Sequence, residues 1–103
     1  MERELKELEA ALNKHAEAQI QHERARGALE LARATALLSG VIVGKNAEER
    51  EAHARTTLAE QYQAVRVAQE TLTWAWARLE MAREHLSVAK IIREVSSGSR
   101  QTR

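Results

Sequence analysis

A seven-residue repeat runs through the second half of this chain and restricts its fold more than any other feature. Leucine or valine recurs at every seventh position, and a smaller residue recurs three or four positions away. The large members are Leu58, Val65, Leu72, Leu79 and Leu86, and the smaller members are Ala54, Gln61, Ala68, Ala75, Ala82 and Ala89. Such alternation on one helical stripe is typical of a coiled-coil seam, because small residues let a partner helix approach closely. The repeat therefore predicts long paired helices.

Composition agrees with an all-α protein that associates with itself. The chain has 103 residues, 3% aromatic and 30% charged residues, and no proline, which favours long helices. A two-helix hairpin of this size buries little apolar surface, so we expect a homo-oligomer. Cysteine is absent, which excludes disulfides and thiolate sites. No apolar run reaches the roughly 18 residues of a membrane span and the first residues do not form a signal peptide, so we expect a cytoplasmic protein.

The expected organisation is one antiparallel hairpin over residues 1–95, with a helix at about 3–39, a loop at 40–46, a second helix at about 47–95 and a flexible tail at 96–103. The first helix has apolar residues near a 3.6-residue spacing. They are Leu5, Leu8, Leu12, Ala16, Ile20, Leu31, Ala34 and Leu38. Gly27 lies within this helix, where we expect it to permit close approach of a neighbouring backbone.

The loop carries signals for the end of one helix and the start of the next. Gly40 follows the first helix where a positive φ is favoured, and Val41 can provide the hydrophobic contact of such a cap. Asn46 and Glu49 have the spacing of a capping box, which predicts that the second helix begins after Asn46. Acidic residues in its first turn favour the same start through the helix dipole.

A second apolar stripe on the second helix indicates how the protein assembles. Val67, Trp74, Met81, Val88 and Val95 also recur every seven residues, about 160° away from the Leu58 stripe. Trp74 and Trp76 lie about 200° apart, so one face cannot bury both. Two apolar stripes predict a helix sandwiched between its own first helix and another subunit, and the sequence leaves open which stripe faces which partner.

The lengths of the two arms point to the same assembly. Counting outward from the loop places Leu5 opposite about Glu80, so residues after His85 have no intrachain partner and form an apolar overhang. Exposing several branched side chains is unfavourable at about 25 cal/mol per Å². The expected oligomer interface therefore comprises Val67, Trp74, Met81, Val88, Ile91, Ile92 and Val95, and the expected intrachain seam is the Leu58 series.

Gly44 and Lys45 superficially suggest a phosphate-binding loop. Three residues instead of four separate Gly40 from Gly44, an asparagine follows Lys45 and a helix precedes the loop, which excludes the nucleotide-hydrolysis motif. A simple anion site at the start of the second helix remains an alternative, with Lys45, Arg50 and Arg55 as its cations.

Catalytic and metal sites have no support in the sequence. The four histidines lack the spacing of convergent metal ligands, and no nucleophile with a base and an acid can be assigned. We therefore expect no cofactor, no metal and no enzymatic activity.

The stretch from Gly40 to Ala52, with its core Gly-Lys-Asn-Ala-Glu-Glu-Arg-Glu-Ala and followed by Leu58 and Tyr62, resembles a group of small helical proteins of tailed bacteriophages. These proteins are often encoded near recombination genes. The resemblance covers about 20 residues and implies a phage origin and an early, non-structural role. It assigns no catalytic residue to this chain.

Two functional hypotheses follow. The favoured one is an oligomeric accessory protein that binds another protein, modulating recombination or inhibiting a host nuclease or defence complex. The alternative is a protein that binds nucleic acid or a nucleotide through arginines near the loop. Interleaved glutamates leave no excess of positive charge there, and this favours the protein-binding hypothesis.

Overall fold

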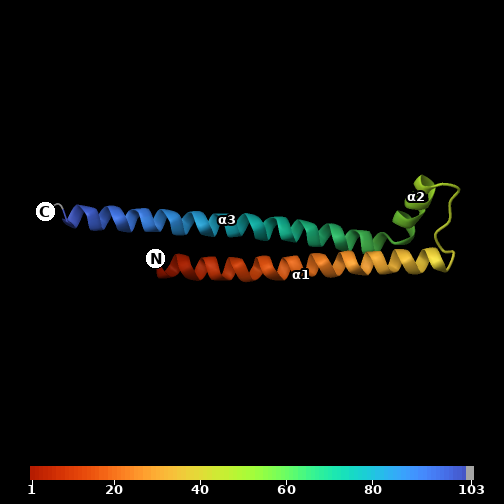
Figure 1. The fold of residues 1–103 in the computed structure, drawn as a ribbon, viewed down its shortest axis with the longest axis horizontal. Helices are drawn as coiled ribbons and strands as arrows, with labels where there is room; N and C mark the ends of the chain where they lie inside the picture. The colour runs from red at the N-terminus through yellow and green to blue at the C-terminus, as the bar shows by residue number, and fades with distance from the viewer. Residues whose placement is uncertain (102–103) are drawn as a thin grey trace. The chain divides into compact units, whose positions relative to one another are not determined.

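The computed structural model describes the backbone of residues 1–101 and the side chains of residues 1–98, and this part contains three helices and no strand. α1 spans Glu2–Leu38, α2 spans Ala47–Thr57 and α3 spans Ala59–Gln101 (Figure 1). The all-α class predicted from the sequence is confirmed. No helix in the described part is both long enough and apolar enough to cross a bilayer.

Two expected helix boundaries are wrong. The helix expected at about 47–95 is divided at Leu58, and α3 continues past Val95 to Gln101. The expected tail at 96–103 is therefore helical as far as Gln101, since this segment contains no proline to interrupt the backbone hydrogen bonds. Residues 102–103 of that expected tail lie outside the described residues.

α1 ends at the glycine that the sequence indicates. Gly40 has a φ of 75°, its N–H donates to the carbonyl of Leu37 at 3.3 Å, and the N–H of Val41 donates to the carbonyl of Ala36 at 2.9 Å. These two bonds form a Schellman motif, which satisfies carbonyls at the end of the helix. The hydrophobic contact expected of Val41 is made by Ile42 instead, which is buried while Val41 is exposed.

The predicted cap of α2 is present, with one change. The side chain of Asn46 accepts a hydrogen bond of 2.8 Å from the N–H of Glu49. Glu49 returns its bond to the N–H of Lys45, also at 2.8 Å, one residue before the position of a standard capping box. Gly44 is needed beside this cap, because a Cβ there would lie 2.7 Å from the backbone nitrogen of Arg50. The loop is therefore closed against the first turn of α2.

The break between α2 and α3 lies next to two adjacent threonines. Thr56 donates its hydroxyl to the carbonyl of Ala52 at 3.2 Å, a bond that often bends helices. Leu58 then leaves helical geometry, with a φ of −108° and a ψ of 33°. Figure 1 shows α2 at an angle to the start of α3. The heptad repeat continues across this point, which is why the sequence pattern alone does not reveal the break.

The chain divides into two compact units. We call residues Ala18–Leu72 the loop unit, and Met1–Glu17 together with Thr73–Arg103 the terminal unit. The loop unit contains the end of α1, the loop, α2 and the start of α3. Its buried cluster consists of Ala36, Ile42, Ala54 and Leu58, with Leu29, Ala32 and Tyr62 packed against it. Ile42 thus brings the loop itself into the core of this unit.

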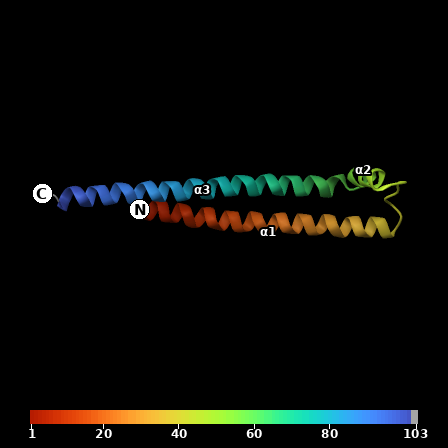
Figure 2. The same cartoon turned by 45° about the horizontal axis from the view of Figure 1, so that its top comes forward.

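In the terminal unit, the first turns of α1 and the distal part of α3 run antiparallel (Figure 2). Ala11 packs with Leu79 and Ala82, and Ala82 is fully buried with an exposure of 0%. Glu7 lies beside His85, not beside a residue several positions earlier as the count from the loop implies. The expected register is therefore wrong, because that count treats α2 and α3 as one helix paired with α1 from the loop onward.

The heptad seam that begins at Ala54 in α2 and continues along α3 faces inward in both units. Leu58 and Leu79 are buried, and Val65, Leu72 and Leu86 are half-buried. Among the smaller residues of the same seam, Ala54, Ala75 and Ala82 are buried, and Gln61, Ala68 and Ala89 are half-buried. The sequence leaves open which of the two apolar stripes packs against the first helix. In the structure it is the Leu58 series that turns toward α1.

The inner face of α1 differs from the expected one. Its buried and half-buried positions alternate at three and four residues, as in a coiled coil. They include Leu8, Ala11, His15, Ala18, His22, Ala25, Leu29, Ala32 and Ala36, and Glu4 and Arg33 are half-buried as well. Leu5, Leu12, Ile20, Leu31 and Leu38 are exposed. Small side chains on α1 thus oppose the leucines of α3. At Gly27 a Cβ would meet nothing within 4 Å, so the expected close approach there is wrong.

Candidate functional site

The residues expected at an oligomer interface are all exposed in the single chain. Val67 lies on the part of α3 in the loop unit, and the other six lie on the part in the terminal unit. We call Trp74, Met81, Val88 and Val95 the outer stripe, because they recur every seven residues on the side of α3 away from its seam. Met81 is 57% exposed although its neighbour Ala82 is fully buried. The terminal unit therefore has a buried inner face and an apolar outer face on one helix.

Both tryptophans of the chain are exposed, and they lie on different faces of α3. Trp74 belongs to the outer stripe and is 73% exposed, whereas Trp76 is 55% exposed. α1 adds exposed Leu5 and Leu12 in the same unit. Tryptophan is enriched among the residues that dominate binding energy at protein interfaces. Large apolar side chains are therefore exposed on two different faces of α3.

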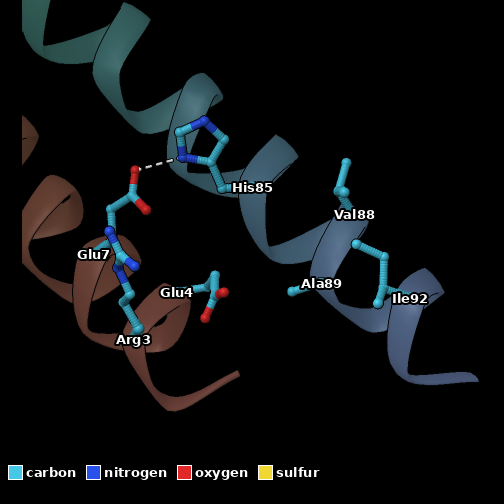
Figure 3. A pocket seen from close by; sticks show the side chains of 7 residues that line it. All are labelled: Arg3, Glu4, Glu7, His85, Val88, Ala89 and Ile92. Carbon is cyan, nitrogen blue, oxygen red and sulfur yellow. Dashed lines mark hydrogen bonds and ion pairs between the residues drawn. The ribbon is translucent and has the colours of Figure 1, made fainter. Parts of the chain in front are cut away.

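Near the start of α1, a shallow groove of about 390 Å³ lies between the two helices of the terminal unit (Figure 3). It is lined by Arg3, Glu4, Glu7, His85, Val88, Ala89 and Ile92. Nδ1 of His85 lies 2.8 Å from a carboxylate oxygen of Glu7, and both side chains are partly exposed. Residues shortly after His85 thus have neighbours on α1, so the overhang begins later than expected, and α3 still projects past the start of α1 within the terminal unit (Figure 1).

The groove has charged side chains from α1 on one side, and His85 followed by apolar side chains from α3 on the other. In Figure 3 the His85 ring and the Glu7 carboxylate point toward one another, whereas Val88 points away from Glu4 and Glu7. Val88 and Ile92 stay exposed although they border the groove. This end of α3 is therefore fixed to α1 by a polar contact and leaves its branched side chains accessible.

The residues of the alternative anion site lie at the loop and along α2, where both guanidinium groups already have partners. The backbone N–H of Lys45 donates to Glu49, and the guanidinium of Arg50 donates to the carbonyl of Gly44 at 3.4 Å. Nε of Arg55 lies 3.5 Å from a carboxylate oxygen of Glu51. The positive charge near this helix start is thus accompanied by Glu49 and Glu51, which weakens its attraction for an anion.

A cluster that the sequence does not predict connects all three helices of the loop unit. The guanidinium of Arg33 lies 2.9 Å from the carboxylate of Glu51 and donates a hydrogen bond of 2.7 Å to the hydroxyl of Tyr62. That hydroxyl donates in turn to Glu51 at 3.2 Å. Arg55 lies over the Tyr62 ring, 5.6 Å from its centre. The sequence signal for this cluster is weak, because it brings together three residues from separate helices.

Electrostatics in this cluster favour its charged form. The hydrogen bond from Arg33, reinforced by its positive charge, lowers the pKa of Glu51 below the usual value of a glutamate. The same contact raises the pKa of Arg33. Both groups are therefore charged at neutral pH. They form an ion pair that joins α1 to α2. Neither group is suited to exchange a proton at that pH.

The histidines have structural neighbours and do not converge. His15 and His22 are half-buried on the inner face of α1. Nδ1 of His53 accepts a hydrogen bond of 3.0 Å from the N–H of Val43 in the loop, and His85 contacts Glu7. Within the described residues, no three histidine, cysteine or acidic side chains are arranged to hold a metal ion.

Comparison with known proteins identifies no relative. No family model matches the chain, and neither the curated proteins nor the solved structures contain a significant match.

Proposed function

We propose that this chain is a non-enzymatic helical protein that associates with a second copy of itself and binds another protein through a separate face of α3. In this proposal the two units continue one another as an antiparallel hairpin, and hairpins assemble into a homo-oligomeric bundle in the cytosol. The observation that carries the proposal is the exposure of both tryptophans on different faces of one helix. A single contact on α3 would leave one of them in water.

The assignment of the two faces follows from their surroundings. The outer stripe is long and repeats every seven residues, as expected for contact with another helix of the same kind. Trp76 lies away from this stripe, in a unit where α1 also exposes Leu5 and Leu12. We assign the outer stripe to self-association and the face of Trp76 to a different protein. Aromatic and aliphatic side chains at such a surface are typical of protein recognition.

The class of partner rests on the resemblance of residues 40–52 to early phage proteins. If the chain has that origin, its partner belongs to a recombination pathway or to a host nuclease or defence complex. The alternative of nucleic-acid or nucleotide binding is disfavoured by the loop unit, where Arg33 and Arg55 are paired with Glu51. Nucleic-acid binding requires cations that are free to neutralise phosphates.

Affinity capture with the full chain tests this proposal. The immobilised protein is incubated with a bacterial lysate treated with nuclease, and bound proteins are identified by mass spectrometry. We expect a specific protein that the wild type retains and Trp76→Ser loses, while Trp76→Ser keeps the oligomeric mass of the wild type. Substitution of Lys45, Arg50 and Arg55 by alanine is the matched control and should leave capture unchanged.

The opposite pattern would overturn the proposal. If nucleic acid copurifies with the untreated protein and is lost from the triple alanine variant, the arginine-rich surface is the binding site. If Trp76→Ser captures the same protein as the wild type, the face of Trp76 is not the binding surface.

A further inference from the structure

The break at Leu58 interrupts only a few backbone hydrogen bonds. The N–H of Leu58 still donates to the carbonyl of Ala54 at 2.8 Å, and its carbonyl accepts from the N–H of Tyr62 at 3.0 Å. Within the described chain, the missing helical bonds are those from the N–H groups of residues 59–61 to the carbonyls four positions earlier. One continuous helix through α2 and α3 would form them. The bend therefore gives up backbone bonds that a straight helix makes.

The local sequence does not require this bend. Residues 47–72 contain neither proline nor glycine, which are common causes of a sharp kink. The hydroxyl bond of Thr56 favours a bend, but Thr35 in α1 and Thr71 in α3 make the same kind of bond without a break. The heptad repeat also continues through this point. The bend must therefore be held by contacts with the rest of the loop unit.

Glu51 and Tyr62 make a contact that only a bent chain allows. They are eleven residues apart, which in a continuous helix places them on one side but about 16 Å apart along the axis. In the structure the hydroxyl of Tyr62 donates to the carboxylate of Glu51 at 3.2 Å. Arg33 of α1 contacts both, at 2.9 Å from Glu51 and 2.7 Å from the Tyr62 hydroxyl. These three side chains thus join the two sides of the break to each other and to α1.

We propose that Arg33, Glu51 and Tyr62 form a latch, and that its release lets α2 and α3 join into one straight helix. The loop can follow α2, because the eight residues between Leu38 and Ala47 extend to about 26 Å. Ile42 and Ala54 are buried in one cluster in the bent chain, and straightening separates them. The latch is therefore a conformational device that decides whether apolar side chains of the loop unit are covered.

Spin labels on two introduced cysteines measure the bend directly, because the natural chain has no cysteine. Glu48→Cys on α2 and Glu70→Cys on α3 are both at exposed positions. They are 22 residues apart, which corresponds to about 33 Å along a straight helix. We expect a shorter distance when the latch is intact. Labelled chains are diluted with unlabelled chains, so that distances between copies in an assembly do not contribute.

Latch variants should change this distance in a graded way. Arg33→Ala should add a component near the straight-helix value and raise the ratio of long to short distances about tenfold. Tyr62→Phe removes only the hydroxyl and should shift the ratio less, in the same direction. Arg26→Ala is the matched control, since Arg26 pairs with Glu23 within α1, and should leave the distance unchanged. Helix content by circular dichroism should not fall in Arg33→Ala, because straightening adds backbone bonds.

Three results would overturn the latch. An unchanged short distance in Arg33→Ala would show that the bend does not need these side chains. A long distance with the latch intact would show that the chain is already straight. A broad distribution with a loss of helix content in Arg33→Ala would show that α2 unfolds instead of joining α3. None of these results depends on whether the chain associates with itself, so the proposed function is tested separately.

Discussion

The loop unit and the terminal unit are stabilised by different means. The loop unit combines a small buried cluster with many polar contacts, among them the Asn46 cap, the Gly40 motif and the ion pair between Arg33 and Glu51. The terminal unit relies on close packing of alanine and leucine, and one polar contact joins Glu7 to His85. Its outer stripe has no cover within the chain. Polar contacts thus fix the turn, whereas close packing of small and large side chains fixes the arms and leaves the outer stripe of α3 exposed.

The largest effect on stability should come from a larger side chain in the buried core of the terminal unit. Ala82→Leu places a large side chain where the exposure is 0%, beside Ala11 and Leu79, and should destabilise the protein by about 1–3 kcal/mol because the helices must move apart. Urea unfolding followed by circular dichroism measures this change. Ala10→Leu, at an exposed position of the same unit, is the control and should have little effect. Equal stability of Ala82→Leu and the wild type would mean that the arms are not closely packed.

The cap of α2 is the next most sensitive point and belongs to the loop unit. Asn46→Ala removes the acceptor for the N–H of Glu49 and should cost about 1 kcal/mol in the free energy of unfolding. Lys45→Ala is the matched control, because the bond from residue 45 to Glu49 uses the backbone N–H and survives the change. The expected result is a loss of stability for Asn46→Ala with an unchanged oligomeric mass. A similar loss for both variants would indicate that the lysine side chain, not the cap, matters.

Two glycines of the loop unit should respond in opposite directions to alanine. Gly27→Ala should stabilise the protein by about 0.5–1 kcal/mol, because alanine favours helix and a Cβ there meets open space. Gly44→Ala should destabilise it, because the new Cβ would lie too close to the backbone of Arg50. Thermal unfolding compares the two variants with the wild type. A loss of stability for Gly27→Ala would reveal a neighbour at that face in the assembled protein.

Acid should affect the loop unit through Glu51. Because its pKa is lowered in the folded chain, its stabilising effect is present above the usual glutamate pKa of 4.5 and is lost as the pH falls through the lowered value. Amide exchange of residues 47–57 should therefore accelerate as the pH falls through this range, after correction for intrinsic rates. Glu51→Gln should show a smaller change than the wild type, and Glu48→Gln should behave like the wild type. No difference between these variants would argue against the ion pair.

Much of the fold follows from local sequence signals, and the remainder depends on contacts between distant residues. Gly40, Asn46 and the Leu58 heptads predict where α1 ends, where α2 begins and that α3 carries an apolar seam. The inner face of α1 is missed because its alanines and histidines are less apolar than the leucines that remain exposed. The register is missed because the break at Leu58 leaves the heptad pattern intact. The Arg33–Glu51–Tyr62 cluster joins three helices, so no local pattern predicts it.

Hydrogen exchange at two protein concentrations tests the contrast between the two units most directly. Association through the outer stripe should increase the protection of amides at 74–95 as the concentration rises from low to high micromolar, because assembly stabilises the helix that it covers. Amides of α2 and the loop at 40–57 should change much less. Two results would contradict association through the outer stripe. One is increased protection confined to residues 40–57, and the other is unchanged protection at 74–95 in a protein that remains monomeric.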